Sequence, residues 1–440
     1  MVLPATATSK TGTILVPEKL SSKTFKGAPG VGVLEHCIAA GEVAKELIKK
    51  VIPNYVRDWI GPEILSVFPF VVSSHDIGKI SAGFQYMIRG NTIPFSAPSY
   101  PLDPVYGTLR HEVVSFEFLR NRLSPFFSSM ILYHHGYYRQ GDHATSYGYS
   151  VDPAWETERL NVYLKLASYF GSCSSYLCAK TSPNLTIQKY LTGLMVVSDY
   201  ISSDESFFPA SGYTIESIPR RVSKALGHYG FYTKGSDSIT DGKNFFDLFG
   251  FQPNEVQAEF ISLVDGPGVY IYEDQMGGGK TEGALYPAID LYRRGVVDGI
   301  YFGMPTQITS NSIIKRVQSA LDKALGDDSN VRLLHSNADM LHDPHQDDWF
   351  VGNKKAMLDE FGVGTADQML LGVLPSVKHF FLRTFGLCNK AVIIDEVHSY
   401  DIYTSGLIRT LIQDLVEMDC VVIILSATLT ESAKKELLGV

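Results

Sequence analysis

The first part of the chain carries hydrophobic positions at helical spacing, interrupted by polar and proline-rich stretches. Residues 39–52, AAGEVAKELIKKVI, place apolar side chains every three or four positions, which predicts a helix with one buried face. Residues 109–123 and 160–177 follow the same pattern. Residues 91–107 are rich in proline and tyrosine and predict a loop, as does the Gly- and Tyr-rich stretch 135–150. This part of the chain is therefore predicted to be helical, with long connections.

The pattern changes after a stretch rich in Gly, Ser and Asp, which predicts a linker over residues 236–250. Beyond it, short apolar runs alternate with helical patterns such as residues 281–294. These runs are GVYIYED, GIYFGMP, KAVIIDE and CVVIILSAT. Such runs are typical of strands buried on both faces of a parallel sheet. The fold class is thus multidomain α and α/β, with an all-helical domain over 1–235 and a doubly wound parallel-sheet domain over 251–440.

Composition and charge narrow the function classes. The chain of 440 residues is 45% hydrophobic and 19% charged, which excludes a wholly disordered protein. Its net charge of −9 excludes a uniformly basic nucleic-acid coat protein but leaves room for a local basic groove. The sequence shows no apolar run near the roughly 18–20 residues of a membrane span. Its five scattered cysteines favour a reducing cytoplasm.

Histidine and aspartate side chains in the helical part point to metal chemistry. His75 and Asp76 end the apolar run FPFVVSS, and His134 and His135 are adjacent in ILYHHGYY. Asp199 lies in an apolar helical pattern, where an unpaired carboxylate would be costly to bury, so a cation partner is expected. Together with His36 and His111 these are seven groups, too many for one tetrahedral ion but suited to two ions that share a bridging carboxylate.

The segment HDIGK resembles the signature of the HD phosphohydrolase superfamily. With LEHCIAA before it and LRHEVVSFEFL, ILYHHGYY and VVSDYISSDESFFP after it, the order resembles the HD nuclease domain of the CRISPR-associated nuclease–helicase of type I interference systems. The resemblance implies that a first ion is held by His36, His75, Asp76 and Asp199. It implies that Asp76 bridges to a second ion, completed by His111, His134 and His135. Lys79 would contact the scissile phosphate, and Ser202 and Ser203 follow the last aspartate as in the family.

A second set of motifs predicts a nucleotide site. EDQMGGGKTEGAL follows a predicted strand and opens a helix. Its backbone would curl round phosphates at Gly277, Gly278 and Gly279, with Lys280 reaching the β and γ phosphates and Thr281 the Mg²⁺. The first glycine of the full Walker A pattern is missing, so the match is to the shorter GxGKT form. Asp395 and Glu396 end another predicted strand and would face the Mg²⁺ and the attacking water.

The form DEVH resembles motif II of superfamily 2 helicases, and the segments around it follow helicase order. FQPNEVQ, with Phe251 and Gln257, resembles an adenine-reading segment. MPTQITSN, GTADQML and LSAT resemble DNA-contact and coupling motifs. The implied nucleic-acid contacts are Thr306, Thr365, Gln368, Ser426 and Thr428. Residues 251–440 would thus be the first RecA-like lobe, with the second lobe absent, and we expect weak ATP binding, negligible turnover and no unwinding from this chain.

The favoured function is a metal-dependent single-stranded DNA nuclease of CRISPR interference, fused to an ATP-dependent translocase. Its catalytic residues would be His75, Asp76 and Lys79, with Glu396 in the ATP site. The cofactors implied are two divalent transition-metal ions (Fe, Mn, Co or Ni) and ATP with Mg²⁺. The partners implied are single-stranded DNA and the guide-RNA surveillance complex, Cascade, in the cytoplasm and away from membranes. Two alternatives remain open: an HD-type phosphohydrolase acting on nucleotides, and a non-catalytic fragment that docks on a partner.

Overall fold

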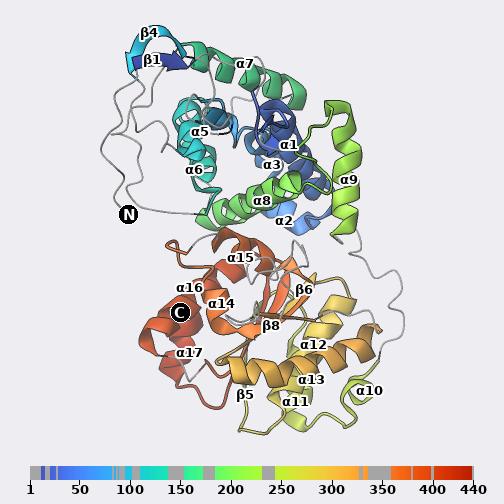
Figure 1. Cartoon of the computed structure of the whole chain (residues 1–440). Coiled ribbons are helices and arrows are strands. Elements are labelled where there is room, and N and C mark those ends of the chain that lie inside the picture. Colours follow the sequence, from blue (N-terminus) through green and yellow to red (C-terminus); the bar gives the residue numbers. More distant parts are fainter. Residues whose placement is uncertain are drawn as a thin grey trace. The chain divides into compact units, whose positions relative to one another are not determined.

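The computed structural model describes residues 11–14, 20–25, 28–81, 84–85, 88, 95–101, 110–136, 153–171, 184–229, 243–326, 331–334, 358–377, 380–397 and 401–438. The chain divides into two compact units (Figure 1). The first comprises residues 1–184 and 194–233, and the second comprises residues 185–193 and 234–440. Each unit has its own core.

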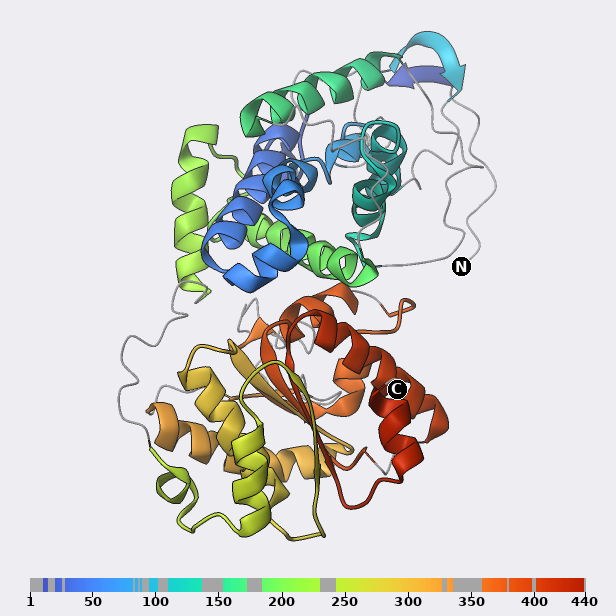
Figure 2. The ribbon, with the colours of Figure 1, turned by 180° about the vertical axis from the view of Figure 1, so that it is seen from behind.

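The first unit is mainly helical, as the spacing of apolar positions predicts. Its α-helices are α1 (Val33–Lys50), α2 (Asn54–Ile60), α3 (Pro62–Ser73), α5 (His111–Leu119), α6 (Pro125–Tyr133), α7 (Pro153–Phe170), most of α8 (Leu185–Ser203), and α9 (Ile218–His228). Two 3₁₀ turns, η1 (Ile77–Lys79) and η4 (Ile215–Ser217), accompany these helices. Both views of the ribbon show α1 and α3 side by side (Figures 1 and 2).

Short antiparallel strands accompany these helices. β2 (Thr24–Phe25) pairs with β3 (Ala28–Pro29), and β1 (Thr11–Ile14) pairs with β4 (Phe95–Pro101). The loop predicted over 91–107 is therefore wrong for β4. Its prolines are compatible with a strand because every strand of a two-stranded sheet is an edge strand. The rest of that predicted loop, 91–94 and 102–107, lies outside the described residues, as does 137–150 of the loop predicted over 135–150.

The first helix approaches the third closely because of one glycine. A Cβ atom on Gly41 would lie 2.8 Å from the carbonyl oxygen of Pro69 and 2.4 Å from the Phe170 ring. Since α3 leads directly into His75 and Asp76, this approach fixes where the HD pair stands relative to His36 in the first turn of α1. Helix packing thus links ligands that are 39 residues apart in sequence (75 − 36).

A second close approach joins η1 to α5. A Cβ on Gly78 would lie 1.9 Å from the carbonyl oxygen of His111 and 2.5 Å from the backbone nitrogen of Ser115. The Gly78 N–H donates to the Ser115 hydroxyl over 2.8 Å. Only glycine therefore lets α5 begin against the HD turn, which brings His111 next to Asp76.

We expect Gly78→Ala to destabilise the chain by roughly 1–3 kcal/mol or more, because backbone atoms rather than a flexible side chain occupy the space of the new methyl group. Equilibrium urea unfolding measures this. The control is Gly406→Ala in an open part of a helix in the second unit, where a Cβ meets nothing within 4 Å and alanine should stabilise by about 0.5–1 kcal/mol. Equal unfolding midpoints for the two variants would show that the Gly78 contact carries no constraint.

The second unit is an α/β domain. Its strands are β5 (Gly268–Glu273), β6 (Gly299–Met304), β7 (Val331–Leu334), β8 (Phe361–Thr365), β9 (Lys390–Ile394) and β10 (Val421–Ser426). Its helices are α10 (Phe245–Phe249), α11 (Glu255–Leu263), α12 (Lys280–Arg293), α13 (Gln307–Leu325), α14 (Ala366–Leu370), α15 (Phe380–Leu387), α16 (Ile402–Glu417) and α17 (Glu431–Leu438).

The six strands form one sheet in the order β5-β10-β9-β6-β8-β7, with every pairing parallel. Helices α12 and α13 pack against it, as do α14 and α16. Alternate residues of β9 and β10, such as Ala391, Ile393 and Ile423, join the core with α11–α13, while the residues between them are buried as well. Burial on both faces explains why these strands are continuous apolar runs, and the predicted doubly wound parallel sheet is confirmed.

The four strands predicted for this unit are β5, β6, β9 and β10, whereas β7 and β8 were not predicted. The linker predicted over 236–250 contains a short helix, α10. Asn244 and Asp247 form a capping box that begins it, because each side chain accepts from the backbone N–H of the other. Residues 236–242 of the predicted linker lie outside the described residues.

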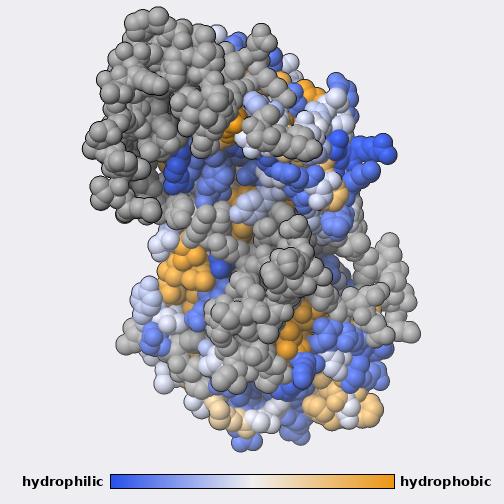
Figure 3. Space-filling view, viewed as in Figure 1, coloured by the Kyte–Doolittle hydropathy of each residue, from blue (hydrophilic) through white to orange (hydrophobic). Residues whose placement is uncertain are grey.

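Among the described residues, no helix is both long enough and apolar enough to cross a membrane. In the face shown in Figure 3, hydrophilic residues are spread over the described surface, with hydrophobic patches between them.

Candidate functional site

The predicted metal ligands of the helical unit lie together in two groups. In each group, one ligand atom per residue lies within 4.8 Å of every other. The first group is His36, His75, Asp76 and Asp199, and the second is Asp76, His111, His134 and His135. Every member of both groups was predicted from the sequence, and Asp76 belongs to both groups.

The two carboxylate oxygens of Asp76 face different groups. Its Oδ2 lies 3.0 Å from His36 Nε2 and 3.4 Å from His75 Nε2. Its Oδ1 lies 3.1 Å from His111 Nε2 and 3.8 Å from His134 Nε2. Asp199 Oδ1 closes the first group at 3.3 Å from His75 Nε2. This is the arrangement of a carboxylate that bridges two cations.

Backbone carbonyls orient two of the imidazoles. The Nδ1 of His75 lies 2.7 Å from the carbonyl oxygen of Val72, and the Nδ1 of His134 lies 2.6 Å from that of Ile131. A carbonyl accepts only from a protonated nitrogen, so Nδ1 carries a proton in each ring and Nε2 is directed toward the carboxylates. Both contacts reach back one helical turn, so the helix itself aims each ring.

The chemistry of the site fits bound cations. His36, His75, Asp76 and His134 are at most 1% exposed. Five of their atoms have no hydrogen-bond partner: His36 Nδ1 and Nε2, His75 Nε2, Asp76 Oδ1 and His134 Nε2. Buried polar atoms without partners are costly. Imidazole and carboxylate donors that converge in this way suit divalent transition metals.

The electrostatics also favour positive charge. Although burial alone would raise the pKa of Asp76, Lys79 and His75 hold it well below its usual range. Burial alone would lower the pKa of His75, but Asp76 and Asp199 raise it to about 10. In contrast, burial and the neighbouring His135 hold the pKa of His134 well below its usual value. The carboxylates thus attract a cation on the His75 side, while His134 stays a neutral donor.

A lysine stands beside the shared carboxylate. Lys79 Nζ lies 2.5 Å from Asp76 Oδ2 and donates to the Ser22 hydroxyl over 3.2 Å. Lys23, from the same N-terminal segment, donates to the carbonyl oxygen of Ser203. Burial, and then the nearby charge of Lys79, lower the pKa of Lys23. The sequence pointed to Lys79 but not to Lys23, which only the fold brings to the site.

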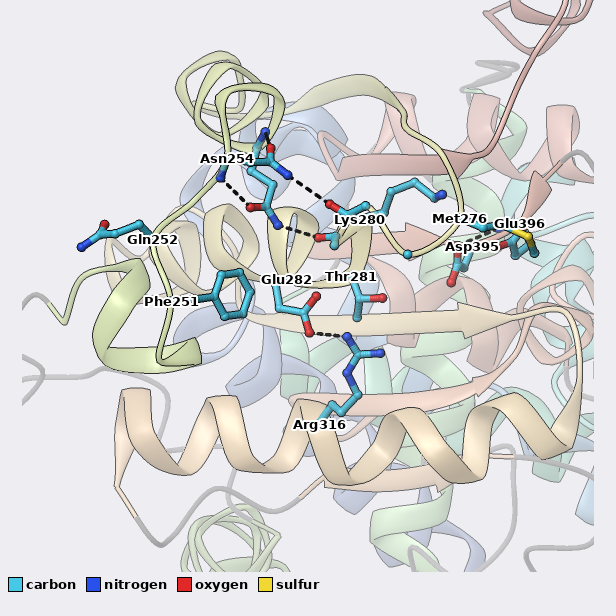
Figure 4. Close-up of a pocket in the computed structure, with 14 residues that line it drawn as sticks. Phe251, Gln252, Asn254, Met276, Lys280, Thr281, Glu282, Arg316, Asp395 and Glu396 are labelled. Atoms are coloured by element: carbon cyan, nitrogen blue, oxygen red, sulfur yellow. Dashed lines mark hydrogen bonds and ion pairs between the residues drawn. The ribbon is translucent and has the colours of Figure 1, made fainter.

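The second unit contains a cavity of about 570 Å³ at the carboxyl end of β5 (Figure 4). Its wall includes the glycine-rich turn and the acidic end of β9. The lining residues are Phe251, Gln252, Asn254, Gln257, Met276, Gly277, Gly278, Gly279, Lys280, Thr281, Glu282, Arg316, Asp395 and Glu396. All eight predicted ATP-binding residues are among them. The carboxyl edge of a parallel sheet is where such folds bind ligands.

The glycine-rich turn of residues 277–279, the predicted phosphate loop, is held in shape by α11. Asn254 and Gln257 form a capping box at the start of that helix. Both amides also reach the loop: Gln257 Nε2 donates to Gly279 O over 2.9 Å, and Asn254 Nδ2 donates to Gly278 O over 3.2 Å. Gly277 and Gly279 have φ of 82° and 83°, a region that favours glycine. The glycine positions are therefore required by the backbone conformation itself.

Lys280 closes on its own loop, donating to the carbonyl oxygens of Asp274 and Gln275 over 2.6 and 3.1 Å. At the end of β9, Asp395 is buried and accepts from the backbone N–H of Glu396 over 2.8 Å. Glu396 has φ 54°, an unfavourable conformation for a non-glycine residue that is typical of functional turns. The arrangement places one cation and two carboxylates at one end of the cavity.

Comparison with known proteins agrees with this geometry. Residues 21–208 match the family described as Cas3, HD domain. These residues include every ligand of both metal groups. The first unit is therefore a Cas3-type HD domain. The predicted resemblance to CRISPR-associated HD nuclease–helicases is confirmed.

Two curated relatives carry both activities in their names. A CRISPR-associated endonuclease/helicase Cas3 from Thermus thermophilus is 29% identical over 94% of this chain and 50% of its own length. A CRISPR-associated nuclease/helicase Cas3 from Streptococcus thermophilus is 34% identical over 57% of this chain and 30% of its own length. The chain thus spans at most about half the length of these relatives.

Solved structures share the fold. T. fusca Cas3 with AMPPNP superposes with a TM-score of 0.73 at 24% identity, over 92% of this chain and 50% of that one. A chain of a CRISPR RNA-guided surveillance complex, pre-nicking, gives a TM-score of 0.64 at 22% identity, over 92% of this chain and 47% of that one. Together they confirm the predicted fold class, a Cas3-type HD domain and a RecA-like lobe.

The nucleic-acid contacts predicted for the second unit differ in their exposure. Thr306 and Thr428 are exposed, at the ends of β6 and β10. Thr365, Gln368 and Ser426 are buried, and Gln368 Oε1 accepts from Arg383 over 3.4 Å. The burial of these three gives no support to a direct contact with DNA, and all five roles stay predictions. Arg316, which lines the cavity, was not predicted, because no sequence motif marks it.

Proposed function

We propose that the first unit is a metal-dependent nuclease that hydrolyses phosphodiester bonds of single-stranded DNA. The single observation that carries this proposal is the Asp76 carboxylate shared by two complete ligand groups. The names of the curated relatives, endonuclease/helicase and nuclease/helicase, support it. We further propose that the nuclease domain covers 1–235, with a linker over 236–250 and the motor lobe over 251–440.

The residues of the site have separate tasks in this proposal. Two divalent ions, when bound, would lower the pKa of a water molecule and neutralise the phosphate. The two histidine–aspartate groups would hold them, with Asp76 as a member of both groups. Lys79, whose side chain is 11% exposed, would turn its ammonium group from Asp76 toward the scissile phosphate, where it counters charge that develops in the transition state. The Nδ1 contacts of His75 and His134 keep both rings oriented throughout.

The second unit would bind ATP with Mg²⁺ and act as the first lobe of a DNA translocase. Lys280 and Thr281 would hold the phosphates and the Mg²⁺, and Asp395 and Glu396 would complete the site. ATP hydrolysis would require a second lobe to supply arginines. The CRISPR-associated relatives, and the likeness to a chain of a surveillance complex, support Cascade bound to target DNA as the partner.

A nuclease assay with matched substrates tests the proposal. With Mn²⁺, Ni²⁺ or Co²⁺ the chain should degrade single-stranded DNA faster than it hydrolyses deoxynucleoside triphosphates, and EDTA should stop the reaction. His75→Ala should reduce DNA cleavage by roughly 100-fold or more, because it removes a proposed metal ligand whose ring is oriented by a backbone carbonyl. His228→Ala, at an exposed histidine of the same unit, should cleave normally. Preferred hydrolysis of triphosphates would favour a nucleotide phosphohydrolase instead, and cleavage retained by His75→Ala would refute the ligand assignment.

A further inference from the structure

We infer that Arg316 contacts the bound nucleotide and forms, opposite Phe251, one side of the site for its base. The inference rests on the proposed binding of ATP to the second unit and assigns a role to a residue that no helicase motif contains. Arg316 belongs to α13, and its side chain lines the same cavity as the phosphate loop.

The guanidinium is held at the cavity by a specific partner. Arg316 Nη2 forms an ion pair with Glu282 Oε1 (Figure 4). Glu282 follows Thr281 directly, so its carboxylate sits beside the proposed phosphate site, where an uncompensated negative charge would repel a nucleotide. Arg316 removes that repulsion. The Arg316 side chain is 50% exposed and presents further N–H donors, since a guanidinium has five.

The position of Arg316 identifies the part of the nucleotide it would meet. Asp395 and Glu396 mark the end of the cavity for Mg²⁺ and the γ phosphate. In Figure 4 they stand on one side, Phe251 stands on the other, and Arg316 points up toward Glu282 between them. Arg316 therefore approaches the ribose and base rather than the terminal phosphate, unlike an arginine that stabilises the transition state of hydrolysis.

An aromatic side chain completes the base site. Phe251 is 43% exposed although it is hydrophobic, and it lines the cavity next to Gln252. Its ring packs edge-on against Phe245, with centroids 5.4 Å apart, which holds it in place. An aromatic ring and a planar guanidinium are the two side chains that stack best on a purine.

Isothermal titration of the full chain with ADP, AMPPNP and inorganic tripolyphosphate tests the inference. In a Glu282→Gln background, where no carboxylate is left uncompensated, Arg316→Ala should weaken the binding of ADP and AMPPNP by the same factor, roughly 10-fold, and leave tripolyphosphate binding unchanged, because only the first two ligands carry a base. The nucleotide affinity of Arg316→Lys should be closer to that of Arg316→Ala than to that of the wild type, since an ammonium group, unlike a planar guanidinium, cannot stack on a base. Glu282→Gln should weaken neither nucleotide by more than about 2-fold, because Arg316 remains at the cavity.

Lys315→Ala is the matched control. It removes the neighbouring cation of α13, which is exposed and is not part of the cavity lining, and all three affinities should match the wild type. In the Glu282→Gln background, a loss of affinity for AMPPNP alone, a loss for tripolyphosphate, or no effect of Arg316→Ala on any ligand would each overturn the base-site role. Wild-type binding that Lys280→Ala leaves unchanged would instead refute the nucleotide site itself, and the role of Arg316 with it.

Discussion

Asp76→Asn should abolish the nuclease and empty both metal sites at once. Purified wild-type chain should contain about two divalent ions, and the variant close to none, by elemental analysis after equilibration with Mn²⁺. The reason is geometric: Oδ2 faces the first ligand group and Oδ1 the second, so removal of one negative charge weakens both. Since the side chain is 1% exposed, water cannot replace the lost ligand cheaply. Single-stranded DNA cleavage should fall by roughly 1,000-fold or more.

Two comparisons make this result specific. His135→Ala removes a ligand of the second group alone, so about one ion should remain bound. Asp58→Asn changes an exposed aspartate of the same unit and should retain both ions and full cleavage. If Asp76→Asn kept one ion, the carboxylate would serve a single site and the bridging role would be wrong.

The sequence predicted the ligands more reliably than the packing that brings them together. The HD pair and the adjacent histidines were recognisable because their residue types and order resemble a family. Nothing in the spacing of His36 and His75 predicts that they lie near one carboxylate. That proximity depends on Gly41 and Gly78, whose missing side chains let backbones approach. In a sequence, a glycine indicates only a position of low helix propensity. It does not show which neighbouring segment packs against it.

The prediction of strands from the sequence has the same limit, because it does not include packing against neighbouring segments. β9 and β10 are uninterrupted apolar runs and were predicted, whereas β8 reads FGVGT and has two glycines in five residues. Glycine lowers strand propensity, so β8 is stabilised by its neighbours β6 and β7 rather than by its own sequence. The unpredicted residues of the sites, Lys23 and Arg316, reach them from distant segments. Burial of Thr365 and Gln368 likewise depends on tertiary packing that no motif encodes.

Lys280→Ala should remove nucleotide binding from the second unit, with the affinity for ADP and AMPPNP reduced by roughly 100-fold. In the structure the ammonium group of Lys280 is satisfied by the carbonyl oxygens of Asp274 and Gln275, and its side chain is largely buried. Nucleotide phosphates would compete for this group, which then pairs with charge instead of with neutral carbonyls. The gain is large because a phosphate oxygen carries a full negative charge opposite the ammonium group, whereas a carbonyl oxygen offers only a partial charge. Isothermal titration measures the loss.

The loop itself should survive this substitution, because Asn254 and Gln257 bind it from α11 independently of the lysine. Gln257→Ala therefore provides the complementary variant: it keeps the cation but removes the amide that holds Gly279, so we expect a smaller loss, of roughly 10-fold. DNA cleavage by the metal site should be unchanged in Lys280→Ala, since all its ligands belong to the other unit. Nucleotide affinity retained by Lys280→Ala but lost in Gln257→Ala would mean that loop shape, rather than the lysine charge, holds the phosphates.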